Sequence, residues 1–217
     1  MRNDLSVDFV GTRLVNPFVL ASAPPTGNYD LIDRAFDLGW AGAVTKSVTS
    51  HPLKDKVPRI KSYRDKQGII FAYQNYEMGS YKSVDYWVRG VEKLKKNHPD
   101  KMLIISLFGT PDLNEWAELT RAFKGTKIDG FELNYSCPHS DSQGKGFIVG
   151  QNISLCKDIT RVVKENSEDG IIIMPKLPYL SYPNEYFIAN ACAGVGANSV
   201  AAINTIAGLI LQLIQIL

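Results

Sequence analysis

The sequence lacks long hydrophobic runs and has few cysteines, and both features narrow the kinds of protein that it can encode. No segment reaches the roughly 18 to 20 uninterrupted apolar residues that span a bilayer, and the start of the chain lacks the apolar run of a signal peptide. The 3 cysteines among 217 residues are separated by long, unequal gaps, which gives neither a disulfide framework nor C-x-x-C metal pairs. We therefore expect a soluble, cytoplasmic protein with no membrane partner.

Charge of one sign and clusters of metal ligands are also scarce. The formal net charge is +2, and the lysines and arginines are scattered rather than gathered into a basic stripe, which argues against a nucleic-acid partner. The 3 histidines form no cluster with metal-ligand spacing, and the glycine motifs that bind phosphates or dinucleotides are missing. With 45% apolar and 21% charged residues, the chain has the composition of one globular domain, which we expect to span residues 1–217 without a metal site.

Short apolar runs alternate with longer amphipathic stretches along the chain, which is the pattern of repeated βα units in a parallel sheet. Strands are expected at Phe18–Ala21, Gly42–Lys46, Met102–Phe108, Gly130–Asn134, Ile171–Lys176 and Ser199–Asn204. Helices are expected at Leu31–Leu38, Val84–Lys96, Leu113–Phe123, Ile153–Glu165 and Glu185–Val195, with Asp112 and Asn152 as N-caps. This order predicts an α/β fold of the TIM (β/α)8 barrel type with about six units, fewer than the eight of a full barrel.

Two segments fall outside this alternation. Leu5–Phe9 and Thr12–Leu14 flank Gly11, which predicts a small N-terminal β-hairpin that would plug the bottom of a barrel. Ser47–Ser80 is rich in lysine and proline and has little hydrophobic period, so we expect a long loop there. Long loops that leave the catalytic face of a barrel are more often functional than idle.

The carboxyl ends of the expected strands carry amides, lysines and hydroxyls, and few carboxylates. A barrel gathers these ends around one pocket. They bring together Ala21, Ser22, Ala23, Lys46, Ser47, Asn134, Cys137, Lys176, Asn204 and Thr205. The paired acids that glycoside hydrolysis requires are absent from this set. Two cations beside neutral amides suit a planar ring that gains negative charge on reduction, as a flavin does, whereas the alternative for each lysine is a snorkelling or ion-paired side chain.

Cys137 is the chemically most distinctive residue among these strand ends. The run G-F-E-L-N-Y-S-C-P-H at Gly130–His139 has the alternation of a short buried strand, and Pro138 cannot donate to a strand ladder, so the strand stops before it. The thiol therefore sits just past the end of a strand. The alternative is a structural cysteine, because free cysteine is among the most buried residue types.

Seven ordered motifs resemble the flavin-binding barrel shared by dihydroorotate dehydrogenases and dihydropyrimidine dehydrogenases. They are N-P-F-V-L-A-S-A at Asn16–Ala23, V-T-K-S with V-P-R-I within Val44–Ile60, Q-N-Y-E at Gln74–Glu77, E-L-N-Y-S-C-P-H at Glu132–His139, V-G-Q at Val149–Gln151, P-K-L at Pro175–Leu177 and A-I-N-T at Ala202–Thr205. The match runs from about Leu5 to Gly208. Q-N-Y-E and S-C-P-H resemble the dihydropyrimidine branch more than the dihydroorotate branch.

The resemblance implies an FMN-dependent oxidoreductase that acts on the 5,6 C–C bond of a pyrimidine. Cys137 would be the general acid or base at C5 while a hydride passes between C6 and N5 of FMN, and an unperturbed thiol with a pKa of about 8.5 still holds its proton near neutral pH. The implied cofactor-binding residues are Ala21, Ser22, Lys46, Ser47, Asn75, Asn134 and Lys176. The implied substrate-binding residues are Asn75, Glu77, Asn134, Asn204 and Thr205, whose amides supply both donors and acceptors to the ring.

The resemblance also bears on the loop after Cys137. Residues 140–147 resemble a mobile lid, with Gly144 and Gly146 as permissive hinges. His139 follows Cys137 in the motif, and the alternative for it is an ordinary loop residue that faces solvent.

Three readings of the function stay open at the level of sequence. The chain has about six βα units and ends in the apolar run L-I-L-Q-L-I-Q-I-L, where a full barrel would hold the FMN phosphate in later loops, so we expect the C-terminal units to be missing. The first reading is the pyrimidine oxidoreductase. The second is a dihydroorotate-specific dehydrogenase of pyrimidine biosynthesis, and the third is a truncated, non-catalytic remnant.

The electron partner is likewise open. Dihydropyrimidine dehydrogenases pass electrons through iron-sulfur clusters, and the spacing of the cysteines in this chain cannot hold one. Either an electron-transfer subunit supplies that relay, or a soluble acceptor reoxidises the flavin, as in dihydroorotate enzymes that work as homodimers.

Overall fold

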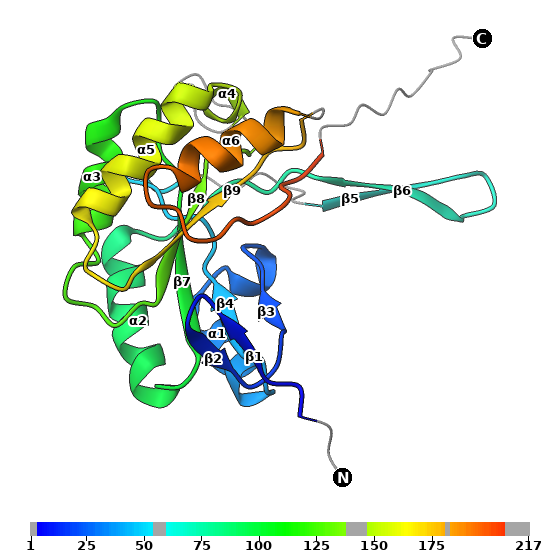
Figure 1. The fold of residues 1–217 in the computed structure, drawn as a ribbon. Helices are drawn as coiled ribbons and strands as arrows, with labels where there is room; N and C mark the ends of the chain where they lie inside the picture. The colour runs from blue at the N-terminus through cyan, green and yellow to red at the C-terminus, as the bar shows by residue number, and fades with distance from the viewer. Residues whose placement is uncertain (1–3, 54–59, 138–146, 181–182, 207–217) are drawn as a thin grey trace.

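A five-stranded parallel sheet forms the centre of the molecule. The computed structural model describes residues 4–53, 60–137, 147–180 and 183–206. The strands are β3 (Val19–Leu20), β4 (Gly42–Val44), β7 (Met102–Leu107), β8 (Gly130–Asn134) and β9 (Ile172–Lys176), and they pair in that order. Helices cover one face of the sheet (Figure 1). Because each strand pairs with the next parallel strand along the chain, this is the connectivity of consecutive βα units.

The remaining elements are short hairpins and the helices between strands. The two hairpins are formed by β1 (Val7–Phe9) with β2 (Thr12–Leu14), and by β5 (Ile60–Arg64) with β6 (Ile70–Asn75). The helical elements are the 3-10 turn η1 (Pro24–Thr26), α1 (Tyr29–Asp37), α2 (Val84–Asn97), α3 (Leu113–Arg121), α4 (Phe147–Gly150), α5 (Ile153–Asn166) and α6 (Asn184–Ala193).

Polar side chains cap the first turns of four of the described helices. The side chains of Asn28, Ser83, Asp112 and Asn152 accept a backbone N–H from the first turn of α1, α2, α3 and α5 respectively. A cap of this kind satisfies one of the amide groups that a helix leaves without an internal partner. The expected N-caps Asp112 and Asn152 are confirmed.

The two faces of the sheet differ because strand side chains alternate. In β7, Leu103, Ile105 and Leu107 belong to the larger core between sheet and helices, together with Trp87 of α2 and Trp116 of α3. These side chains are essentially inaccessible to solvent. Burial of large apolar side chains on this scale is the main force that holds helices to sheet.

The inner face of the sheet changes in character from one end of the strands to the other. Along β7 it carries Met102 and Ile104 first and Ser106 last, and along β9 it carries Ile172 and Met174 first and Lys176 last. The apolar end packs against Leu14 of the β1–β2 hairpin and lines a cavity of about 580 Å³. The hairpin thus closes the amino end of the strands, as expected, and polar groups collect at the carboxyl end.

Two sequence expectations need correction. The expected sixth strand, Ser199–Asn204, is not a regular strand, since it makes only one β-bridge, between Ala201 and Lys176. The N–H groups of Ala201 and Leu177 donate to the carbonyls of Pro175 and Ala201, each at 2.9 Å, so this segment still runs alongside β9. The N–H groups of Asn198 and Asn204 donate to the carbonyls of Ile173 and Leu177, so three residues of this segment oppose two of β9 on each side of the bridge, and the regular register of a ladder is not kept.

The second correction concerns the expected loop from Ser47 to Ser80. It contains the β5–β6 hairpin, which projects away from the body of the molecule (Figure 1). Ile60, Phe71 and Tyr73, on one face of the hairpin, are 55%, 64% and 70% exposed, and no residue of β5 or β6 is buried. Because a strand shows a hydrophobic period of two only where one face is buried, the pattern that would have predicted these strands is absent.

A helix that crosses a bilayer needs about 20 consecutive, predominantly apolar residues. Within the described ranges, no helix is both long and apolar enough to cross a membrane.

Candidate active site at the carboxyl ends of the strands

A cavity of about 250 Å³ opens where the parallel strands end. Its wall includes every residue that the resemblance implies as catalytic, cofactor-binding or substrate-binding, from segments far apart in the chain. These residues are Ala21, Ser22, Lys46, Ser47, Asn75, Glu77, Asn134, Cys137, Lys176, Asn204 and Thr205. Ala23, Pro24, Met78 and Ile203 complete the wall.

The ends of β3 and β4 are tied together by Thr26, a buried residue of the η1 turn. Its hydroxyl lies 3.3 Å from the carbonyl oxygen of Ala21 and 3.0 Å from that of Ala23, and it accepts the N–H of Ala23 at 3.1 Å. The carbonyl of Thr26 accepts the backbone N–H of Lys46 at 3.0 Å. These bonds fix the segment of Ser22 against the segment of Lys46 and Ser47.

Lys46 forms an ion pair with Glu77 on the cavity wall. The Nζ atom of Lys46 lies 2.5 Å from Oε2 of Glu77, and the two side chains are only 11% and 5% exposed. The backbone N–H of Glu77 donates to Oδ1 of Asn75 at 2.8 Å, which places Asn75 and Glu77 in one turn after β6. The hairpin that the sequence did not predict therefore delivers two wall residues to the site.

Lys176 is paired as well, with Glu132 of the neighbouring strand β8. The Nζ atom of Lys176 lies 3.6 Å from Oε1 of Glu132, and Glu132 also accepts the hydroxyl of Ser106 at 3.0 Å. Burial raises the pKa of the Glu132 carboxyl, and Lys176 and Ser106 oppose that shift because they stabilise its charged form. Both lysines are therefore ion-paired, which is one of the alternatives that the sequence left open. Both also line the cavity, where a ligand can contact them.

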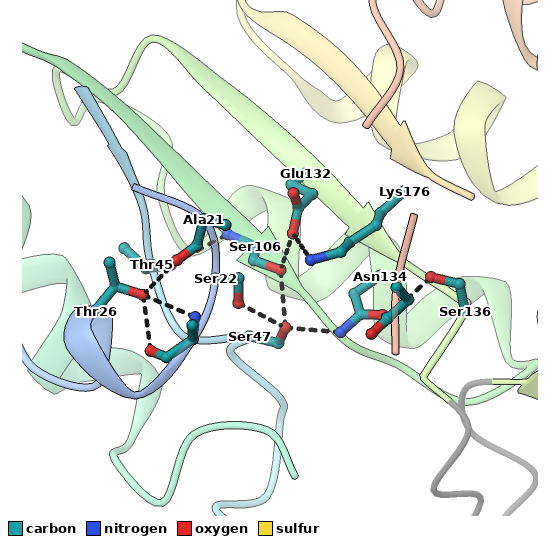
Figure 2. A network of polar contacts seen from close by, with 12 residues as sticks. Ala21, Ser22, Thr26, Thr45, Ser47, Ser106, Glu132, Asn134, Ser136 and Lys176 are labelled. Atoms are coloured by element: carbon teal, nitrogen blue, oxygen red, sulfur yellow. Dashed lines mark hydrogen bonds and ion pairs between the residues drawn. The ribbon is translucent and has the colours of Figure 1, made fainter. Parts of the chain in front are cut away.

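Hydroxyls connect the Lys176–Glu132 pair to the amide of Asn134 (Figure 2). The Oγ atom of Ser47 lies 2.9 Å from Oγ of Ser106 and 3.3 Å from Oγ of Ser22, and it accepts Nδ2 of Asn134 at 2.8 Å. Nδ2 of Asn204 donates to Oδ1 of Asn134 at 2.9 Å and to Oγ of Ser136 at 3.0 Å. Buried polar groups linked in this way are held in one orientation.

Cys137 is buried, at 7% exposure, yet it lines the cavity. Gly150 of α4 packs against the segment that precedes it, so closely that any side chain at Gly150 would overlap the carbonyl oxygen of Tyr135. This contact gives the V-G-Q motif a packing role next to the thiol. Cys137, Cys156 and Cys192 form no disulfide.

The other two cysteines occupy a different environment. Cys156 and Cys192 are fully buried in the core between sheet and helices, and burial raises the pKa of both thiols. The Sγ atom of Cys192 lies 3.1 Å from the hydroxyl of Tyr135. Both residues fit the structural role that the sequence left open for Cys137.

Sequence reasoning did not single out Glu132 and Ser106, although both underlie the site. Glu132 occupies the middle of the buried strand β8 between Phe131 and Leu133, and its side chain lies on the same face as that of Asn134. Ser106 interrupts the apolar run of β7 in the same way. A polar residue inside a fully buried strand was the available signal, because such a residue requires a partner.

Two expectations cannot be placed. His139 and the segment 140–146 of the expected lid lie outside the described residues. Within the described ranges, no group of three or more histidine, cysteine, aspartate or glutamate side chains is arranged to hold a metal ion.

A parallel α/β sheet with helices on one face and a polar cavity at its carboxyl edge has the arrangement that TIM-barrel proteins use for their active sites. The family model of dihydroorotate dehydrogenase matches residues 4–214, and the chain belongs to that family. The open five-stranded sheet is consistent with an incomplete form of the barrel that characterises the family.

Individual relatives bear both of the names that the motifs suggested. The chain is 30% identical over 213 residues to dihydropyrimidine dehydrogenase (NADP(+)), chloroplastic, of Arabidopsis thaliana, covering 94% of this chain and 49% of that protein. It is 31% identical over 209 residues to the NAD-dependent dihydropyrimidine dehydrogenase subunit PreA of Escherichia coli (strain K12), covering 95% and 49%. It is 33% identical over 204 residues to the catalytic subunit of dihydroorotate dehydrogenase B (NAD(+)) of Pyrococcus abyssi, covering 93% and 62%. The chain thus spans about half the length of the first two relatives.

Proposed function

We propose that this chain forms the flavin- and pyrimidine-binding site of an oxidoreductase that acts on the 5,6 C–C bond of a pyrimidine. The observation that carries the proposal is the single cavity wall that joins a thiol, two lysines and several amides from five separate segments. The relatives named as dihydropyrimidine dehydrogenases support this substrate class.

The donors on the wall fit the polar edge of a flavin ring. Lysines, hydroxyls and amides offer a charged group and several neutral hydrogen bonds on one side of the cavity, which is what a ring with carbonyl and N–H groups requires. We assign the binding of FMN to Ala21, Ser22, Lys46, Ser47, Asn75, Asn134 and Lys176. When bound, FMN supplies the chemistry of hydride transfer.

The substrate would lie against the amides. Asn75, Asn134, Asn204 and Thr205 would bond the carbonyl and N–H groups of the pyrimidine, and Glu77 would accept a ring N–H. Because Asn134 and Asn204 already bond one another, their orientation is set before a ligand arrives, which lowers the entropy that binding must overcome. Cys137 would hold the proton that is exchanged with C5 of the pyrimidine.

A second candidate is a dihydroorotate-specific dehydrogenase. Two lysines on the cavity wall favour it, because a cation stabilises the carboxylate that orotate carries, and the Pyrococcus abyssi relative has this name. Glu77 argues against it, since a second carboxylate on the same wall would repel that of the substrate. We therefore place the dihydropyrimidine activity first.

The names of two relatives also suggest how electrons enter or leave. One is named as a subunit and the other as a catalytic subunit. We propose that a partner subunit exchanges electrons with the flavin site of this chain. Homodimer formation and a soluble acceptor stay as predictions from the sequence.

The test is anaerobic loss of flavin absorbance when FMN-loaded protein is mixed with dihydrouracil or with dihydroorotate. We expect dihydrouracil to bleach the flavin, and Cys137→Ala to lose at least about a hundredfold in rate with an unchanged flavin spectrum. Cys156→Ala removes a thiol outside the site and serves as the control.

The other outcomes decide between the alternatives. Bleaching by dihydroorotate alone would establish the second candidate, and bleaching by neither compound would favour a non-catalytic protein. A normal rate in Cys137→Ala would refute the acid-base role of this thiol.

A further inference from the structure

The buried carboxylate of Glu132 terminates a chain of hydrogen bonds that begins at the cavity wall. The chain begins at Asn204, which bonds Asn134. From Asn134 it continues to Ser47, Ser106 and Glu132 (Figure 2). Each link is between 2.8 and 3.0 Å long. None of these bonds joins Glu132 directly to Asn134 or Asn204. An effect of Glu132 on either amide therefore passes through the hydrogen bonds of Ser106 and Ser47.

An ionised carboxylate determines which way every hydrogen in this chain points. It can only accept, so the hydroxyl of Ser106 donates to it, and Ser106 must then accept from the hydroxyl of Ser47. Ser47 has thereby used its only hydrogen, and its two lone pairs accept from Asn134 and from Ser22. The hydrogen-bonding capacity of Ser47 is completely used in this arrangement.

The same logic fixes the two amides. Because Ser47 accepts, Asn134 presents its Nδ2 group toward Ser47 and its Oδ1 atom toward Asn204. Asn204 meets that oxygen with Nδ2, whose second hydrogen goes to Ser136. Reversing either amide would set two donors or two acceptors against each other.

Lys176 favours the charged form of the Glu132 carboxylate. Its ammonium group lies 3.6 Å from Oε1 of Glu132, and both side chains are largely buried, at 12% and 3% exposure. An opposite charge so near favours the ionised form of the acid and opposes the effect of burial, which raises its pKa. Glu132 therefore links the cationic edge of the cavity to its amide edge.

We propose that Glu132 is a positioning residue whose charge sets the donor and acceptor pattern that Asn134 and Asn204 present to a ligand. The inference rests on the proposed function for the identity of that ligand. A fixed pattern of donors and acceptors selects a 2,4-dioxopyrimidine over a 4-aminopyrimidine. The dioxopyrimidine has a donor at N3 and an acceptor at its 4-carbonyl, whereas the aminopyrimidine has an acceptor at N3 and a donor at its 4-amino group. Mismatched pairs of this kind leave buried groups without partners and are strongly rejected.

Two variants separate the chain of bonds from the charge. Glu132→Gln removes the charge, and Ser106→Ala breaks the chain while it leaves Glu132 and Lys176 in place. Glu118→Gln and Ser62→Ala make the same chemical changes at exposed positions on α3 and β5 and serve as matched controls. Thermal melting of each variant establishes that it is folded.

The first measurement needs no ligand. The side-chain amide resonances of Asn134 and Asn204, assigned by their loss in Asn134→Asp and Asn204→Asp, are followed by ¹⁵N–¹H NMR. We expect both Glu132→Gln and Ser106→Ala to shift the two amides, and neither control to do so. Unchanged resonances in Glu132→Gln would overturn the proposal. Because Ser106→Ala is a small substitution, it keeps the test valid even if Glu132→Gln does not fold.

The second measurement uses the FMN-loaded protein and compares dissociation constants for uracil and cytosine. We expect the wild-type protein to prefer uracil, and this preference to fall about tenfold or more in both site variants but not in the controls. An unchanged preference in the two site variants would overturn the proposal. If the wild-type protein binds neither base, the proposed function fails, and the amide resonances alone decide the role of Glu132.

Discussion

The three cysteines illustrate how environment decides the chemistry of identical residues. Cys137 lines the cavity, whereas Cys156 and Cys192 lie at 0% exposure in the core, where burial raises the pKa of their thiols. Since the thiolate is the reactive form, we predict that iodoacetamide alkylates Cys137 well before the other two in the native protein. Mass spectrometry of peptides after timed labelling checks this.

Cys137→Ser should remove the early labelling event and leave the slow ones unchanged. Labelling of Cys156 or Cys192 at the rate of Cys137 would contradict the environments described, unless the protein had unfolded. Protection of Cys137 by a bound pyrimidine would independently place the ligand in the cavity.

Glu132 gives a prediction about pH. Burial raises the pKa of this carboxyl in the folded protein, and Lys176 and Ser106 oppose the shift. The folded state therefore holds the proton more tightly than the unfolded chain, whose acid has the ordinary value of 4.5. The stabilisation is fully present below that value and is lost as pH rises through the folded-state pKa.

Because the side chain in Glu132→Gln cannot titrate, the comparison isolates this contribution. The free energy of unfolding of the wild type minus that of the variant should fall as the pH rises above 4.5, measured by urea denaturation. A difference that rises with pH would mean that Lys176 outweighs burial and that the pKa is lowered.

At the residue scale, the sequence predicted which side chains would meet but not how they would pair. Position at the end of a strand is a local property, and it sufficed to bring Lys46, Asn134 and Lys176 to one cavity. The partners Glu77 and Glu132 depend on which strands become neighbours and on the path of the chain after β6. No single segment of the sequence determines these pairings.

At the scale of elements, close pairing of β8 with β9 positions both Glu132 and Lys176. Gly130 lies at the start of β8, and a Cβ atom there would come within 2.7 Å of the carbonyl oxygen of Ile172 in β9. We predict that Gly130→Ala destabilises the protein by about 1 to 3 kcal/mol, because backbone on both strands must shift. Urea denaturation measures the change.

Gly194 offers the matched control for that substitution. It ends α6 with φ at −62°, and the nearest atoms to an added Cβ are 3.5 and 3.7 Å away. Gly194→Ala should change stability by no more than about 0.5 kcal/mol. Equal effects at the two positions would show that the close approach of β8 and β9 is not what Gly130 provides.

The elements that the sequence predicted well are those with one consistently buried face. The bounds of β8 agree with expectation, and β4, β7 and β9 differ by at most two residues at an end. The β5–β6 hairpin escaped prediction because its apolar side chains are largely exposed. Ser199–Asn204 was overpredicted because an apolar run does not show whether a segment keeps the regular register that a full ladder requires. Hydrophobic periodicity indicates which face of an element is buried, and it does not indicate which strands are hydrogen-bonded to one another.

At the scale of the whole molecule, one gradient organises the fold and the site. The inner face of the sheet is apolar where the β1–β2 hairpin covers it and polar where the strands end. The same strands therefore build a core at one end and a binding site at the other. Membership of the dihydroorotate dehydrogenase family agrees with this arrangement.

We propose above that the cavity at the strand ends binds FMN. The most direct test is to titrate the purified chain with FMN and to follow the visible absorbance of the flavin, with Lys176→Met as a site variant and Glu118→Gln as a control. We expect a perturbed flavin band that saturates at one FMN per chain. The affinity for FMN should be weakened in Lys176→Met and unchanged in the control. A flavin spectrum that stays that of free FMN throughout the titration would contradict it.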